Sequence, residues 1–204
     1  MATNYLSSAE YINNLAFDYI ETYSLLRGTD YEEKEKVLRA EYDQLRIKDN
    51  ANKLTSDEEV RFYALQGQLD RQQYLINASG QFHFSSKKTN TFSGNDPIVE
   101  RLKTSLKTEV KSVPRLLCEA IYRDVVVFYD SNHQIVSVLN VCLGCNYMAS
   151  DSNPINADWE TYDLLKHLFI DIGHDVEAPG VFHWEDMKKQ YEKYRKHRPN
   201  RGKL

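Results

Sequence analysis

The chain has 204 residues, of which 41% are hydrophobic, so it is long enough to bury a core that folds without a cofactor or a disulfide framework. Its formal net charge of −4 is small and mixed along the chain, which argues against a surface built throughout for nucleic acid. It has no apolar run of about 18 residues and no start of the secretory type, so we expect a cytoplasmic protein.

The first predicted element is a helix near the N-terminus. Ser7 with Glu10 fits a capping box, in which each residue satisfies a backbone N–H group of the other. Gly28 is expected to end the helix in the left-handed conformation that glycine tolerates. Between these positions, apolar residues recur at the three-to-four spacing of one helix face: Tyr11, Ile12, Leu15, Ala16, Tyr19, Ile20 and Tyr23.

Two further helices are predicted over 30–49 and 56–77, and the second is opened by Ser56 with Glu59. Each carries its apolar residues on one side, and the polar link between them suits an antiparallel helical hairpin. We therefore predict that residues 1–77 form a helical bundle part.

Residues 78–96 are rich in Ser, Asn, Thr, Lys and Gly and form the predicted linker. Within it, the alternating stretch QFHFS favours a short edge strand with His83 facing solvent. Helices are predicted over 96–109 and 114–121, because Pro97 and Pro114 fit first-turn positions where no backbone N–H is needed.

A β-hairpin is predicted over 124–142. Residues 124–130 are β-branched and aromatic, residues 134–142 largely alternate apolar with polar, and SNH between them supplies turn residues, including His133. The stretch CNYMAS favours a third strand, so we expect a small antiparallel sheet. The predicted fold class is α+β.

The C-terminal helices complete the predicted α+β part, which spans 97–204. One helix covers about 157–172 and ends at Gly173, and the last covers about 183–197. No internal repeat of about 20–50 residues is evident.

The two cysteines of the stretch CLGC allow three interpretations. Cys142 and Cys145 have the spacing of half a zinc site, which His174 and His183 would complete. A redox pair is less well supported, because the residues after Cys145 do not start a helix that would lower a thiol pKa. We favour two small residues that pack behind the hairpin. With Cys118, interpreted as a core residue, all three are predicted to be free thiols.

The C-terminal segment from Lys188 onwards is strongly basic. It is interpreted first as a solvated helix end, where cations meet the helix dipole favourably. The alternative is a phosphate-binding tail of a nucleic-acid binder. Its candidate residues are Lys188, Lys189, Lys193, Arg195, Lys196 and Arg198.

The sequence lacks known catalytic and nucleotide-binding patterns. GxSxG, GxGxxG and GxxxxGK[ST] do not occur, which argues against an activated serine and against ATP, GTP or dinucleotide ligands. The chain is rich in tyrosine, with fourteen residues, and tyrosine is frequent at protein interfaces. This composition favours a protein partner.

The segment from Val125 to Glu177 resembles part of some uncharacterised small bacterial proteins. The resemblance lies in VVVFYDSNHQIVSVLNVCLGCNYM followed by TYDLLKHLFIDIGHDVE: FYD before a turn and strand, a cysteine-containing loop, and a helix that ends near Gly. Some proteins of this kind are cytosolic antidotes encoded beside toxins. The resemblance therefore implies an immunity-type binding function, but it transfers no functional residues.

The leading hypothesis is a non-enzymatic bacterial binding protein, of the immunity type, that neutralises a toxin by direct contact. It rests on the acidic charge, the many tyrosines and the missing catalytic patterns. The alternatives are an enzyme or regulator with a Cys/His zinc site, and a nucleic-acid binder that acts through the basic tail.

Overall fold

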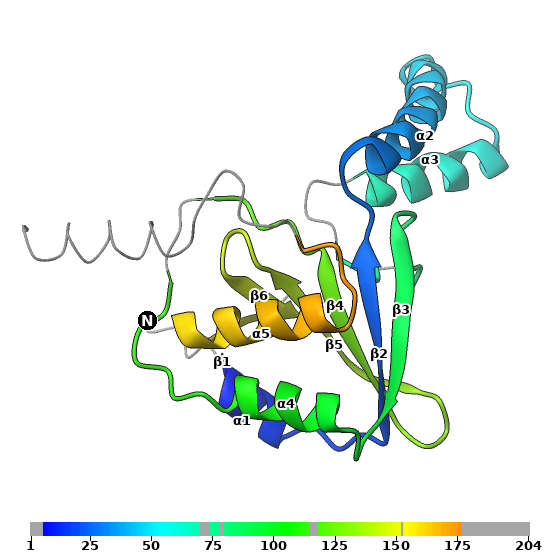
Figure 1. Cartoon of the computed structure of the whole chain (residues 1–204). Helices are drawn as coiled ribbons and strands as arrows, with labels where there is room; N and C mark the ends of the chain where they lie inside the picture. The colour runs from blue at the N-terminus through cyan, green and yellow to red at the C-terminus, as the bar shows by residue number, and fades with distance from the viewer. Residues whose placement is uncertain (1–5, 70–73, 78–79, 115–117, 152, 177–204) are drawn as a thin grey trace, which may run out of the picture. The chain divides into compact units, whose positions relative to one another are not determined.

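The structure is a computed structural model (Figure 1). It describes residues 6–69, 74–77, 80–114, 118–151 and 153–176. Its contacts divide the chain into two compact units, Met1–His174 and Asp175–Leu204. The first unit contains every helix and strand described below.

A seven-stranded mixed sheet forms the centre of the first unit. Its strand order is β1-β7-β6-β5-β4-β2-β3, in which β1 runs parallel to β7 and the other neighbours are antiparallel. The α+β class is confirmed, but the expected small antiparallel sheet is in fact larger and mixed. The strands are β1 Leu6–Ser7, β2 Tyr19–Leu25, β3 Ser86–Ser93, β4 Asp124–Tyr129, β5 Ile135–Cys142, β6 Tyr147–Ser150 and β7 Asn153–Asn156.

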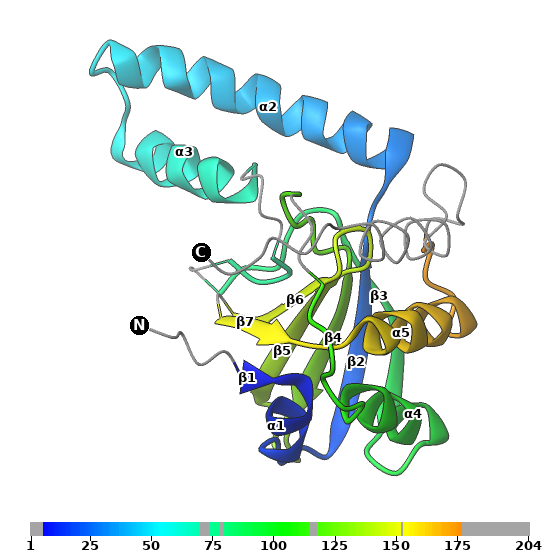
Figure 2. The same cartoon turned by 90° about the vertical axis from the view of Figure 1, so that its left-hand side faces the viewer.

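Three helices cover one face of this sheet: α1 Ser8–Asn13, α4 Pro97–Leu106 and α5 Trp159–Asp171 (Figures 1 and 2). Phe128 of β4 is fully buried beneath them, with the rings of Tyr11 and Phe17 packed edge-on against it. Burial of such large apolar side chains is the main favourable term in folding. The helices predicted over 96–109 and 157–172 are confirmed as α4 and α5.

A pair of antiparallel helices, α2 Gly28–Asn50 and α3 Ser56–Gln68, is inserted between β2 and β3 (Figure 2). The helix predicted over 30–49 is confirmed. The other ends at Gln68 rather than 77, and its capping box is Thr55 with Glu58, one position before the predicted pair. The strands on either side remain paired up to the insertion, because Leu25 and Ser86 are register partners.

The prediction of one helix from the apolar spacing between residues 11 and 23 is wrong beyond the first turns of that helix. The capping box of Ser7 and Glu10 is present, but α1 ends at Asn13 and the chain then enters β2. Tyr19 and Tyr23 are four residues apart, a spacing that places them on one face of a strand as well as of a helix. Gly28 begins α2 with a positive φ of 56° instead of ending a helix.

The predicted linker 78–96 contains a strand, β3. This strand is polar because it lies at the sheet edge and exposes much of its surface, including Lys87 and Lys88. Charged edge strands resist pairing with other chains. In the predicted helix 114–121, the described residues 118–121 are not helical.

The predicted hairpin 124–142 is confirmed as β4 and β5, and the predicted third strand as β6. All six residues of β4 are buried, which explains why the five that follow Asp124 are apolar, β-branched or aromatic. Gly173 follows α5 with a φ of 84°, and the N–H groups of Gly173 and His174 donate to the carbonyls of Ile170 and Phe169. This Schellman motif turns the chain sharply at His174.

Gly94 marks a close approach of two backbones after β3. Its N–H donates to the Asp18 carbonyl at 2.7 Å, and an added Cβ would lie only 2.8 Å from the same oxygen. We predict that Gly94→Ala destabilises the fold by about 1–3 kcal/mol, because the backbones must separate. Urea unfolding measures this cost.

The matched control is Gly67→Ala in α3, where an added Cβ comes no closer than 3.9 Å to Asn77 Nδ2. Alanine is the better helix former, so stability should be unchanged or rise by up to about 1 kcal/mol. Equal losses for the two variants would contradict the proposed steric cause.

Candidate functional site

A buried ion pair joins the start of α2 to the start of β4. Arg27 Nη2 donates to both carboxylate oxygens of Asp124, at 2.9 and 2.8 Å. The Arg27 side chain is 9% exposed and that of Asp124 is 2% exposed. A buried charge of either sign is very costly without its partner, so each of these groups requires the other.

His174 extends this ion pair into a polar chain. Its Nδ1 lies 2.9 Å from Asp124 Oδ1, and its Nε2 lies 2.9 Å from Thr89 Oγ1. Because a carboxylate only accepts, Nδ1 carries the proton that is donated to Asp124. Thr89 Oγ1 continues the chain to the buried Thr22 hydroxyl, 2.7 Å away. We call Arg27, Asp124, His174, Thr89 and Thr22 the buried polar chain.

An acid, an imidazole and a hydroxyl in this order are also the groups that activate a nucleophile in many hydrolases. The surroundings here differ from those of such a site. The His174 side chain is 0% exposed, and Thr89 Oγ1 also lies 2.9 Å from the Thr22 carbonyl. The buried polar chain therefore fixes four segments, namely β2 with the start of α2, β3, β4 and the end of α5.

A second polar junction holds the other end of the inserted helices. Gln68, the last residue of α3, accepts at its side-chain oxygen from the Phe84 N–H at 2.8 Å. Its carbonyl lies 3.1 Å from Nε2 of His83, and His83 Nδ1 lies 2.8 Å from Ser85 Oγ. We call Gln68, His83, Phe84 and Ser85 the α3 junction.

The predicted solvent-facing position of His83 is wrong, because this residue is only 6% exposed. Burial lowers the pKa of His83 to about 4, although its bond to the Gln68 carbonyl favours the protonated ring. The neutral ring satisfies both partners: Nε2–H donates to Gln68, and Nδ1 accepts from the Ser85 backbone N–H at 3.3 Å. Protonation would place a second donor against that N–H group.

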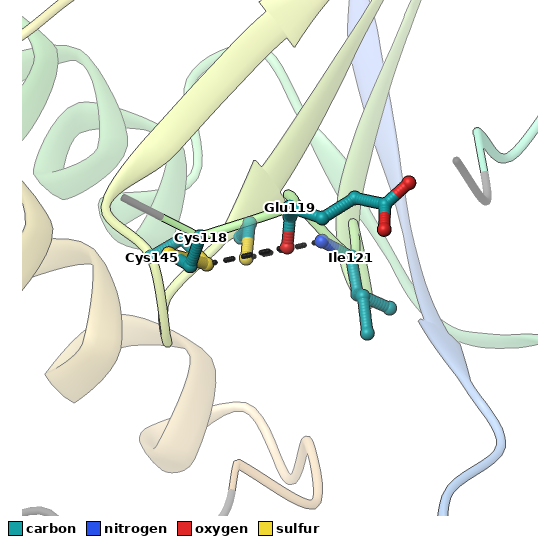
Figure 3. The surroundings of a disulfide bond; sticks show 5 residues. Cys118, Glu119, Ile121 and Cys145 are labelled. Carbon is teal, nitrogen blue, oxygen red and sulfur yellow. Dashed lines mark hydrogen bonds between the residues drawn. A yellow bond between two sulfur atoms is a disulfide. The ribbon is translucent and has the colours of Figure 1, made fainter. Parts of the chain in front are cut away.

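The three cysteines lie together, but they are not all free. Cys118 and Cys145 form a disulfide (Figure 3). Cys142 is a buried free thiol. The prediction of three free thiols is therefore wrong for two of them, and Cys118 is exposed rather than a core residue. Cys142 and Cys145 are buried behind the β-hairpin as expected, among Ala120, Tyr122 and Ala149.

Of the four predicted zinc ligands, the structure describes Cys142, Cys145 and His174, and it does not arrange these three as a metal site. The Cys145 sulfur is bonded to Cys118, and both ring nitrogens of His174 have other partners. Within the described ranges, no group of three or more His, Cys, Asp or Glu side chains is arranged to hold a metal ion. His183 lies outside those ranges, so the zinc site stays a prediction.

The nucleic-acid alternative also stays a prediction. The helix expected over 183–197 and the basic residues from Lys188 to Arg198 lie outside the described residues.

The described helices include none that is long and apolar enough to cross a membrane.

The most exposed large apolar side chains in the described part of the chain lie on the inserted helices. Val60 is 72% exposed, Ile47 69%, Val37 68% and Tyr63 58%, whereas no such side chain elsewhere exceeds 45%. We call these four residues the exposed hairpin residues. Residues 28–69 carry ten Asp or Glu and seven Lys or Arg, so they account for most of the net charge of the chain.

Sequence reasoning missed Arg27, Asp124 and Gln68. An acid that opens the strongly apolar run DVVVFYD signals a buried carboxylate in need of a partner. The partner could not be identified, because Arg27 precedes Asp124 by 97 positions. Gln68 carried no signal of its own within a long polar helix.

No protein-family model, curated protein sequence or solved structure matches the chain. The roles of its residues therefore rest on their geometry and chemistry.

We predict that Asp124→Asn destabilises the fold by about 3–5 kcal/mol, because it leaves the Arg27 guanidinium buried without a counter-charge. Asp171→Asn is the matched control. Asp171 pairs with Arg101 at 2.8 Å, but the two side chains are 55% and 46% exposed, so the loss should stay below about 1 kcal/mol. Similar losses in the free energy of unfolding by urea would show that the buried pair stabilises the fold no more than the exposed pair does.

The α3 junction predicts a pH dependence. Since the pKa of His83 falls from 6.5 to about 4 on folding, its contribution is fully present above 6.5 and is lost as the pH falls toward 4. The loss amounts to at most about 3 kcal/mol. His83→Gln keeps a donor for the Gln68 carbonyl but does not titrate, so urea unfolding should show a smaller acid-induced loss. An unchanged pH profile would contradict this role of His83.

Proposed function

We propose that the chain is a non-enzymatic binding protein that contacts a partner protein through the α2–α3 hairpin. The observation that carries the proposal is the concentration of exposed apolar side chains there, at Val37, Ile47, Val60 and Tyr63. Single exposed apolar residues are common on any protein surface. Here, however, the four most exposed large ones in the described residues all belong to one inserted element.

The hairpin has little apolar surface buried within itself. Its buried cluster consists of Leu45, Phe62 and Leu65, with Leu38, Tyr42 and Leu54 partly buried beside them. In α2, which has 23 residues, only Leu45 is buried. A helix that gains so little from packing is an unusual insertion for stability alone, whereas apolar side chains exposed to solvent are what a partner helix or groove can bury.

The hairpin is also held at both of its ends. Arg27 anchors the start of α2 through the buried polar chain, and Gln68 anchors the end of α3 through the α3 junction. Anchored ends reduce the conformational freedom that is lost on binding, which improves affinity without any new contact. The two buried polar sites thus serve the proposed binding surface.

The partner that fits this surface is a protein with a basic, partly apolar face. The excess of acidic residues over 28–69 would steer a basic partner, and the exposed hairpin residues would supply the apolar contacts. With the resemblance of residues 125–177 to immunity-type proteins, this favours an antidote that neutralises a toxin by direct contact.

The test is expression of the chain with the product of its neighbouring gene. We predict that the two proteins co-purify and that the chain protects cells from that product. Val60→Asp should weaken binding by about thirtyfold or more, because a charge that must lose its water then replaces an apolar contact residue. Isothermal titration calorimetry with the purified pair measures the change.

Ile170→Asp is the matched control, since it adds the same charge at a residue of α5 that is 45% exposed. Its affinity should stay close to that of the unmodified chain. If the neighbouring product neither co-purifies nor is neutralised, the antidote function is wrong. If both variants bind normally, the hairpin is not the contact surface.

A further inference from the structure

The cysteine cluster contains a free thiol in addition to a disulfide, and a structural cross-link alone does not need that thiol. The Cys118–Cys145 disulfide joins the segment before β4 to the loop between β5 and β6. Cys142 lies three positions from Cys145 at the end of β5, in the same buried cluster. A third sulfur beside a disulfide allows one bond to be exchanged for another.

The two ends of the disulfide have different surroundings. Cys118 is exposed, whereas Cys145 is 8% exposed and its sulfur lies 3.4 Å from the Glu119 carbonyl oxygen (Figure 3). A sulfur that leaves as a thiolate is stabilised by water. Cys118 is therefore the better leaving group, and Cys145 is the sulfur that an internal thiolate would attack.

The Cys142 sulfur faces backbone N–H groups, which favour its thiolate. The Ile121 N–H donates to it at 3.4 Å, and the backbone N–H groups of Gly144 and Cys145 also act to lower its pKa. Cys142 and its target Cys145 are three positions apart and belong to the same buried cluster. Burial raises the pKa of the thiol against these donors and the nearby charge of Arg123. At neutral pH, Cys142 is therefore mostly in the protonated thiol form.

We propose that Cys118, Cys142 and Cys145 form a thiol–disulfide exchange site, in which Cys142 displaces Cys118 from Cys145 and releases a reactive thiol at the surface. Cys142 first gives its proton to solvent. Its thiolate then bonds to the Cys145 sulfur while the Cys118–Cys145 bond breaks. The bonding electron pair leaves with the Cys118 sulfur, which takes a proton from water, so no oxidant or reductant is consumed.

The released Cys118 thiol is a modification site for small thiols and disulfides. Glutathione disulfide is the appropriate probe, because an exposed thiolate attacks it to form a mixed disulfide and free glutathione. Glutathione bound to Cys118 at the surface would then mark the exchanged state, in which the Cys142–Cys145 disulfide closes the buried loop.

Exchange is followed in the full chain without added thiols. The protein is incubated in mildly alkaline buffer, quenched in acid, denatured and alkylated with N-ethylmaleimide, and its peptides are mapped by mass spectrometry. At the start only Cys142 should be alkylated. Alkylated Cys118 and a Cys142–Cys145 linked peptide should then appear together. As long as the pH is below the pKa of the Cys142 thiol, raising it by one unit should speed their appearance by up to about tenfold. If Cys118 is never alkylated, the proposal is wrong.

Two variants test which cysteine attacks the disulfide and which one leaves it. Cys118→Ser changes an exposed position, and in glutathione disulfide it should form the Cys142–Cys145 bond. Its circular dichroism spectrum checks the fold. Cys142→Ser should keep the Cys118–Cys145 bond and show no alkylation of Cys118 at any time. Glutathione bound to Cys145 beside a free Cys142 in the first variant, or alkylated Cys118 in the second, would overturn the exchange site.

Discussion

The ion pair between Arg27 and Asp124 is the interaction on which the rest of the structure depends. Both groups are almost entirely buried, and His174, Thr89 and Thr22 complete their bonding. Because these residues come from β2, β3, β4 and the segments after β2 and α5, one polar chain sets the positions of elements that are far apart in sequence. Buried ionic groups contribute less to net stability than apolar packing does, but they penalise any arrangement that separates them. Their role here is to select one arrangement.

The sequence predicted most of the elements but not their assembly. The alternation in 124–142, the amphipathic spacing of α2 and α5 and the first-turn proline of α4 were strong enough to locate those elements. Tyr19 and Tyr23 misled because a four-residue spacing suits both a strand and a helix, and β3 was hidden because an edge strand can be polar. The sheet was thus predicted too small, since β1, β2 and β3 depend on pairings between distant segments and β7 has only four residues.

The same limit applies to the candidate sites. Cys145 and His174 were singled out from the sequence, but their actual partners are Cys118 and Asp124, which local spacing cannot reveal. His83 was placed toward solvent because its neighbours alternate, whereas the end of α3 covers it. A residue's type shows what chemistry it offers. Only the fold shows which groups meet it.

The pairing of Leu25 with Ser86 has a consequence for how such a protein can diversify. The sheet closes at the base of the hairpin, so its hydrogen bonding does not depend on what the chain does between those two residues. The α2–α3 hairpin can therefore vary in length and surface while the scaffold keeps its core, provided that the anchoring groups at its base and Leu75, which belongs to the core of the sheet, are retained. The surface of the hairpin can therefore change at little risk to the folding of the sheet.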